Sequence, residues 1–492
     1  MPTLPRVIDS DALVPDLLVG YVSVTSQGGT SVLDADDLGD PEGYEGSAED
    51  RRSADHAAEA SGLEVIAESA LGRAVVGPPG AFAQLTGGRI VPRERLVHTR
   101  AGRKQYVTHF DIVGEGQPEA FGAGVASSRE SGIEAVVLER PRFPHAIFPS
   151  PKPPPVAAFH LRVPDDVALV LGAQAAQRRG HDGRDVNVAM VDTGHFTHPF
   201  FTAHGYDLAP TTAMVPGTDP AKDPVGHGTG ESANIFAVAP RATLRPYRAS
   251  DDKGRLVATL AAFLRAKQDG PHVLTNSWGG DYDEPFPDQP DPADRAIALE
   301  IQDAIKKGIV VVFSAGNGHF SVEPQVPGVI SAGGVFADRA LNLRASDYAS
   351  GYESKWFGGV KVPLVSGAVG MLPRADYIML PVQPGCELDT ECAVADEEGA
   401  PGDGTGPKDG WARFSGTSAA APQVAGACAA ILSANRDLKP DQVAQVLADT
   451  AVDVVAGRNH PRFNNMAVAG RDLATGFGLI DVGAATEAAA KL

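Results

Sequence analysis

Cysteine, basic residues and aromatic residues are all scarce in this sequence. Three cysteines among 492 residues are too few, and an odd number, for a disulfide framework. Asp and Glu outnumber Lys and Arg by 62 to 42, which gives a net charge of −20. A surface of that sign repels phosphate backbones and anionic lipid head groups, so we expect no nucleic-acid partner and no membrane binding.

Long hydrophobic runs are also missing near the N-terminus. Asp9, Asp11 and Asp16 interrupt every candidate apolar stretch there. We therefore expect neither a secretory signal nor a transmembrane span, and a cytoplasmic location, with export by another route left open. Hydrophobic residues at 43% and charged residues at 21% are ordinary for a globular protein. The length favours two domains over one core.

Two biased segments divide the chain. Residues 148–155 (FPSPKPPP) hold five prolines, which exclude a helix or a central sheet strand and indicate an extended linker. We expect an N-terminal domain over 1–147, a linker over 148–160 and a second domain over 161–492. Residues 33–50 are acidic and contain glycine, which predicts a solvated loop.

Strand and helix patterns are mixed before the linker. Ser47 and Gly62 give start and stop signals for an Ala-rich helix between them. Residues 80–88 predict a short second helix. Strand-like runs occupy residues 16–24, 63–69, 73–77 and 132–141. A small α+β domain is the expected result.

Strands and helices alternate after the linker. Apolar strand-like runs lie at 186–194, 242–249, 272–280 and 309–317, and helical patterns at 257–270 and 291–308. This alternation predicts an α/β fold, a mostly parallel sheet covered by helices. Active groups of such sheets lie at the carboxyl ends of strands, which here are Asp192, Ser277 and Asn317.

Three short motifs carry residues suited to nucleophilic catalysis. Asp192 follows an apolar strand in VDTG (191–194), and His227 lies between two glycines in GHGTG (226–230). Ser418 in GTSAAAP (416–422) precedes an Ala-rich helix, so its hydroxyl lies where free N–H groups and the positive helix dipole gather.

These residue types complement one another chemically. A serine hydroxyl becomes a good nucleophile when a histidine takes its proton, and a carboxylate orients that histidine and stabilises the imidazolium. The resulting oxyanion needs donors, which the backbone N–H of Ser418 and the Asn317 amide in SAGNG (314–318) can supply.

In this order, the four segments resemble the subtilase family of subtilisin-like serine peptidases, over about residues 161–490. The resemblance implies a subtilisin-like fold and a serine endopeptidase that hydrolyses polypeptides through an acyl-enzyme on Ser418. It implies the catalytic set Asp192, His227, Ser418 and Asn317. It also implies that NSWGG (276–280) is a substrate-binding strand. The expected substrate-binding residues are Ser277, Trp278, Gly279, Ser314, Ala315 and Gly316.

The chain departs from the family pattern in two places. Gly230 stands where the family often has a second histidine. Residues 374–410 look like an insertion, for which a surface loop is favoured over a role in specificity. The N-terminal domain loosely resembles the family's inhibitory propeptide, which predicts self-processing near residues 145–165. A permanent regulatory or partner-binding domain is the alternative.

Other candidate sites have simpler interpretations. His195 and His198 are expected in a polar loop without a metal, and Cys386 and Cys392 as free thiols. Cys428 is expected in the core. No cofactor is required; calcium binding is left open, and for the acidic run 281–294 a solvated loop is preferred. Competing functions are a catalytically silent peptide- or partner-binding scaffold, and an esterase or peptide ligase.

Overall fold

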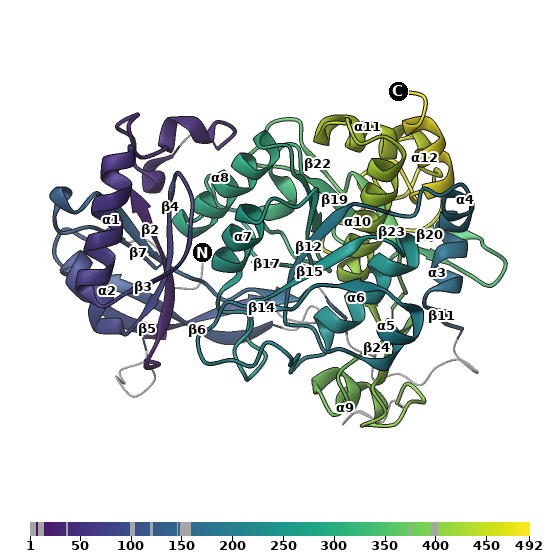
Figure 1. Ribbon diagram of the computed structural model, residues 1–492, viewed down its shortest axis with the longest axis horizontal. Coiled ribbons are helices and arrows are strands. Elements are labelled where there is room, and N and C mark those ends of the chain that lie inside the picture. The colour runs from purple at the N-terminus through teal and green to yellow at the C-terminus, as the bar shows by residue number, and fades with distance from the viewer. Residues whose placement is uncertain are drawn as a thin grey trace.

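The computed structural model describes residues 6–7, 14–35, 38–98, 104–118, 122–144, 146–147, 159–372, 375–394 and 402–492. Most of the predicted linker, residues 148–158, lies outside the described residues. The larger part of the chain, from residue 159 onward, is built on a central sheet (Figure 1).

The central sheet confirms the predicted α/β fold. Its strands follow the order β13-β15-β12-β16-β18-β19-β20, with β14 beside β15 and β23 beside β19. Every pairing is parallel except that of β19 with β20. The strands are β12 (Asn187–Asp192), β13 (Asp207–Leu208), β14 (Thr212–Ala213), β15 (Thr243–Arg248), β16 (Val273–Asn276), β18 (Val310–Ser314), β19 (Ile330–Ala337), β20 (Leu343–Ala345) and β23 (Val365–Ala368).

Helices cover both faces of this sheet, so its strands are buried on both sides. On β12, Val188 and Met190 pack into one core and Ala189 and Val191 into the other, as the two-residue period of a strand requires. The first core includes α6 (His227–Val238) and α10 (Thr417–Ala434). The second core includes α7 (Thr259–Gln268) and α8 (Pro292–Lys306).

Helix α10 runs through the middle of the first core. A Cβ on Gly426 would lie 2.8 Å from Cβ of Val238, so a glycine there lets α10 approach α6 closely. Among the described residues, α10 is the one helix long and apolar enough to cross a membrane, but 89% of it is buried inside the protein. We therefore interpret α10 as a core helix.

Smaller elements complete this part of the molecule. They are the helices α3 (Asp165–Val170), α4 (Ala173–Arg178), α5 (Pro199–His204), α9 (Glu387–Ala393), α11 (Pro440–Thr450) and α12 (Val482–Ala489), the 3-10 turn η6 (Glu323–Gln325), and the strands β11 (Leu161–Arg162), β17 (Trp278–Gly279), β21 (Tyr352–Glu353), β22 (Lys361–Val362), β24 (Ile378–Pro381) and β25 (Trp411–Gly416). Strand β25 leads directly into α10.

The N-terminal region has its own five-stranded antiparallel sheet, in the order β3-β4-β2-β8-β7. One face packs on two helices around a separate core, and the other face packs on α7 and α8 (Figure 1). The elements are β2 (Leu18–Val24), α1 (Ala48–Ser61), β3 (Glu64–Glu68), β4 (Gly72–Gly77), α2 (Pro79–Thr86), β7 (Ala123–Val125) and β8 (Ile133–Leu138).

The predicted helix signals at Ser47 and Gly62 are confirmed. The Ser47 hydroxyl accepts a hydrogen bond from Asp50 N, and Gly62 ends α1 with a left-handed φ of 92°. The sequence patterns did not predict the hairpin of β5 (Arg89–His98) and β6 (Lys104–Val113), which β1 (Arg6–Val7) joins.

Three expectations about loops are wrong. Residues 33–50 are not simply solvated, because Leu38 and Tyr44 are buried and the 3-10 turns η2 (Val32–Asp34) and η3 (Pro41–Tyr44) pack on α8. The acidic run 281–294 buries Asp294 and Tyr282. Within 374–410, β24 joins a sheet and α9 buries Leu388, so this region is not a surface loop; residues 395–401 lie outside the described residues.

Candidate active site

Three element ends position the predicted catalytic residues. Asp192 ends β12, His227 begins α6, and Ser418 is the second residue of α10. A Cβ on Gly228 would lie 3.0 Å from Cβ of Asp192 and would collide with the Gly194 carbonyl. Glycine at 228 is therefore needed so that the helix bearing the histidine can approach the strand bearing the aspartate.

Asp192 and His227 form a buried pair. Oδ1 of Asp192 lies 2.7 Å from Nδ1 of His227 and also accepts a hydrogen bond from Thr193 N at 2.7 Å. Their relative exposures are only 2% and 1%. This contact directs Nε2 of the imidazole away from the carboxylate, which is the orientation that a general base needs.

A second carboxylate, Glu231, lies on the other side of the imidazole. Its Oε1 is 3.6 Å from Nε2 of His227, and Glu231 follows His227 by one turn of α6. Its Oε2 accepts a hydrogen bond from Asn234 Nδ2 at 2.9 Å, and Asn234 Oδ1 accepts one from Gln423 Nε2 of α10 at 3.1 Å. Glu231 is fully buried, and our sequence reasoning missed it. The sequence feature that could have identified Glu231 is its position four residues after His227 on the same helix, which places the two side chains on one face.

These two groups change each other's protonation. Burial alone lowers the pKa of His227, but the negative charges of Asp192, Glu231 and Asp223 outweigh burial and raise that pKa above its usual value. Burial raises the pKa of Glu231 to about 7, against the opposing effects of His227 and the Ser418 hydroxyl. The His227 pKa is therefore raised by the carboxylates around it, and Glu231 titrates near neutral pH.

Asn317 is fixed at the start of α10. Its Oδ1 accepts hydrogen bonds from the backbone N and the hydroxyl of Thr417, at 2.9 and 3.1 Å. Among the described residues, no hydrogen-bond partner is found for Asn317 Nδ2 or His227 Nε2, although both atoms are buried. Buried polar atoms are normally paired, so these two are available for a bound substrate, and Ser418 Oγ lies close enough to Glu231 to lower the pKa of that carboxyl.

Some of the predicted substrate-binding residues contact the start of α10 or form β17, whereas Ser314 and Ala315 pair with the neighbouring strand of the central sheet. Ser277 donates a hydrogen bond to the Ser418 carbonyl at 2.9 Å, and Gly316 N donates one to Thr417 Oγ1 at 3.0 Å. Trp278 and Gly279 form β17. In contrast, Ser314 pairs with Ala332 in the sheet and Ala315 N bonds the Ala332 carbonyl, so this N–H is not free for a substrate.

A segment from the N-terminal region lies across this site. Arg142 forms an antiparallel bridge with Leu256. The next strand, β9 (Phe143–Pro144), pairs antiparallel with β17, with Pro144 opposite Trp278. Then β10 (Ala146–Ile147) pairs antiparallel with β25, with Ala146 opposite Gly416. The chain thus passes from the expected substrate-binding strand to the strand that leads into Ser418.

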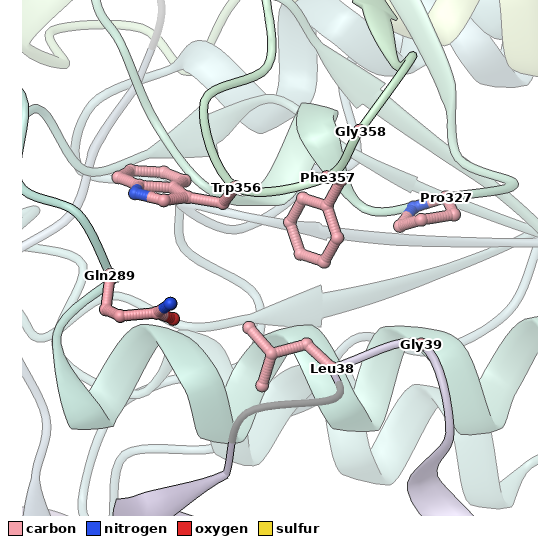
Figure 2. Close-up of a pocket in the computed structure, with 7 residues that line it drawn as sticks. All are labelled: Leu38, Gly39, Gln289, Pro327, Trp356, Phe357 and Gly358. Carbon is pink, nitrogen blue, oxygen red and sulfur yellow. The ribbon is translucent and has the colours of Figure 1, made fainter.

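A separate hollow of about 270 Å³ does not belong to this site. Figure 2 shows Leu38 and Gly39 of the N-terminal region on one side and Trp356, Phe357 and Gly358 on the other. None of the predicted catalytic residues lines it. It is a gap in the interface between the two parts of the chain.

The remaining candidate ligands have structural contacts. His195 Nδ1 lies 3.0 Å from the Ser232 hydroxyl, and His198 Nδ1 accepts a hydrogen bond from Phe200 N at 3.1 Å. Within the described ranges, no group of three or more His, Cys, Asp or Glu side chains could hold a metal ion. The three cysteines are buried free thiols.

Comparison with known proteins gives a consistent picture. The model of the subtilase family matches residues 183–478. The minor extracellular protease Vpr of Bacillus subtilis (strain 168) is 32% identical over 170 residues, 31% of this chain and 20% of that protein. Subtilisin BL of Lederbergia lenta is 26% identical over 293 residues, 57% of this chain and 89% of that protein.

One solved structure extends the likeness to nearly the whole chain. The crystal structure of fervidolysin from Fervidobacterium pennivorans, described as a keratinolytic enzyme related to subtilisin, superposes with a TM-score of 0.54. At 19% identity it covers 98% of this chain and 62% of that one. This likeness shows the fold. This chain spans a fifth of the length of Vpr and less than two thirds of fervidolysin.

Proposed function

This chain belongs to the subtilase family of serine peptidases, and on that premise we propose that it is an endopeptidase that cleaves polypeptides through an acyl-enzyme on Ser418. The observation that carries the proposal is the buried contact of 2.7 Å between Asp192 and His227. It fixes the imidazole with Nε2 3.6 Å from Oε1 of Glu231, a carboxylate whose pKa both His227 and the Ser418 hydroxyl lower.

The proposed reaction has two halves, formation of the acyl-enzyme and its hydrolysis, and each group acts in both. His227 Nε2 takes the proton of Ser418 Oγ as this oxygen attacks the substrate carbonyl, and then gives the proton to the leaving amine. Asp192 accepts the Nδ1–H bond and stabilises the imidazolium. Asn317 Nδ2 and the backbone N–H of Ser418 donate to the oxyanion. Water then hydrolyses the acyl-enzyme by the same steps, with His227 as its base.

Hydrolysis of a denatured protein substrate tests this proposal. We expect activity in the full chain and its loss in Ser418→Ala. Ser433→Ala is a matched control on the same helix, because that hydroxyl bonds the Ala430 carbonyl near the far end of α10. Equal activity of Ser418→Ala and the unmodified chain would contradict the proposal.

We further propose that the N-terminal domain inhibits the enzyme and is cut by it. Two short strands of the N-terminal part of the chain support this proposal. Strand β9 pairs with β17, and β10, the next strand along the chain, pairs with β25, which leads into Ser418. Main-chain pairing of this kind is how extended peptides bind to strand edges. The two peptide bonds that join Pro144 to Ala146 lie between these pairings, so one of them is the proposed cleavage site.

The docking of the N-terminal domain supports the same proposal. Helix α7 begins at Thr259 without a capping side chain of its own. Glu139 supplies that cap from the N-terminal domain, with Oε1 accepting hydrogen bonds from Leu260 N at 3.0 Å and from the Thr259 hydroxyl. Tyr21 also donates a hydrogen bond to Glu300 of α8 at 2.9 Å.

Intact-mass measurement tests self-processing. We expect the purified chain to separate into two fragments with a new N-terminus at residue 145 or 146, and Ser418→Ala to remain whole. A cut only within 148–160, or the same fragments from Ser418→Ala, would contradict this cleavage site.

A further inference from the structure

Arg142, directly before β9, enters a buried acidic pocket. Its Nη1 lies 2.9 Å from Asp294 Oδ1 and 2.9 Å from Glu323 Oε1. The three side chains expose 2%, 1% and 0% of their surfaces. The guanidinium carbon also lies 5.8 Å from the centre of the Trp278 ring, within reach of a cation–π interaction.

The pocket and its occupant come from different parts of the chain. Asp294 lies in the first turn of α8, Glu323 begins η6 and Trp278 begins β17, so the pocket belongs to the catalytic domain. Arg142 directly precedes β9, which belongs to the N-terminal part of the chain and pairs with β17. The pocket therefore remains in the enzyme whenever that part of the chain leaves.

Two buried carboxylates demand a cation. Desolvation of an isolated carboxylate is costly unless an opposite charge compensates it. Burial raises the pKa of Glu323, and Arg142 opposes that shift. Arg140, two residues before Arg142, adds a second cation, with Nη1 2.6 Å from Asp294 Oδ2 and 3.1 Å from Asp291 Oδ2.

The geometry suits arginine better than lysine. A planar guanidinium can face two carboxylates and an aromatic ring at once, whereas an ammonium is a compact, strongly hydrated point charge. The strand pairing also fixes the distance along the chain. Arg142 stands two residues before Pro144, so it is the third or fourth residue before the proposed cut.

We infer that Asp294, Glu323 and Trp278 form a subsite that selects polypeptide substrates with an arginine three or four residues before the cleaved bond. This inference rests on the proposed function, because it takes the N-terminal segment as a guide to how substrates bind. It adds a substrate class that the catalytic motifs alone do not define.

Peptides based on residues 138–149 test the inference. Four versions carry arginine, lysine, citrulline or alanine at the position of Arg142, and each is offered to the full chain after self-processing. Citrulline keeps the shape of arginine without its charge. We expect kcat/KM for the arginine peptide to exceed that for the citrulline peptide by about 100-fold, the effect of breaking a buried charge pair.

Variants of the pocket sharpen the test. Glu323→Gln and Asp294→Asn should each reduce the ratio of kcat/KM for the arginine peptide to kcat/KM for the citrulline peptide. Because both values come from the same variant, a general loss of activity does not change this ratio. Asp288→Asn is the control, because that carboxylate is exposed and pairs with Lys355. Equal cleavage of arginine and citrulline peptides overturns the inference and leaves the proposed function intact. Cleavage of no peptide contradicts the proposed function, and the inference with it.

Discussion

Two buried clusters of charge in this molecule differ in how their charges are balanced. Around His227, the carboxylates of Asp192 and Glu231 have that imidazole as their described ion-pair partner. Around Asp294, two arginines compensate the acids. A guanidinium keeps its charge at every working pH, whereas an imidazole titrates near neutrality. The cluster around His227 can therefore transfer protons, whereas the cluster around Asp294 can only bind a cationic side chain.

The largest effect should come from breaking the proton-moving cluster. Asp192→Asn removes the acceptor of the Nδ1–H bond, so the imidazole loses its preferred tautomer. We expect kcat to fall about 10⁴-fold, a loss typical of this substitution in serine peptidases. Asp449→Asn serves as a control, because that carboxylate accepts a hydrogen bond from Gln445 at an exposed position of α11, a helix that carries none of the predicted catalytic residues. A decrease below tenfold would contradict the role of Asp192.

Loss of the oxyanion donor should have a smaller effect. Asn317→Ala removes Nδ2, so we expect kcat to fall about 100- to 1000-fold with little change in KM. Steady-state kinetics on a peptide substrate measure this split. Asn342→Ala, at an exposed turn where its amide bonds Asp338, should change neither constant. A change in KM alone would mean that Asn317 binds substrate without stabilising the transition state.

The charge-balanced cluster predicts an effect on stability. In the Ser418→Ala background, where the chain stays whole, Arg142→Ala leaves Asp294 and Glu323 with less compensation. We expect docking of the N-terminal domain to weaken by about 3–5 kcal/mol, the cost of breaking a buried pair. Limited proteolysis and thermal unfolding measure it. Arg162→Ala, which removes an exposed ion pair with Asp166, should have little effect, and equal results for the two variants would contradict the prediction.

The smallest effect should be a shift along the pH axis. The imidazole acts as a base only when unprotonated, so activity falls as pH decreases through the raised pKa of His227. Ionised Glu231 contributes to that raised pKa, while Asp192 and Asp223 contribute independently. Glu231→Gln should therefore move the acid limb of kcat/KM to lower pH.

His195 is another titratable group near α6, but burial lowers its pKa to about 3, so it stays neutral in this range. An acid limb that stays in place, or moves to higher pH, would contradict the assigned role of Glu231.

Local motifs predicted the fold, which the structure confirms, and four candidate site residues, three of which stand at the ends of regular elements. Asp192 ends an apolar strand, and His227 and Ser418 begin helices, so periodicity and motif identify them together. The motifs did not identify Glu231 as a site residue, because its contacts depend on the packing of α6 against α10. The acidic run around Asp294 predicts a solvated loop, but Asp294 is buried because it pairs with Arg142, which is 152 residues away in sequence. Burial that depends on such distant pairing has no local signal.

Labelling with a fluorophosphonate probe tests the central claim most directly, namely that His227, held by Asp192, activates Ser418 beside the strands β17 and β25, with which β9 and β10 pair. Tandem mass spectrometry of the labelled chain locates the modified residue. The account predicts modification of Ser418 alone, faster after self-processing than before it, and none in Ser418→Ala. Failure of Ser418 to react in the folded, processed chain, or equal labelling of other serines, would contradict it.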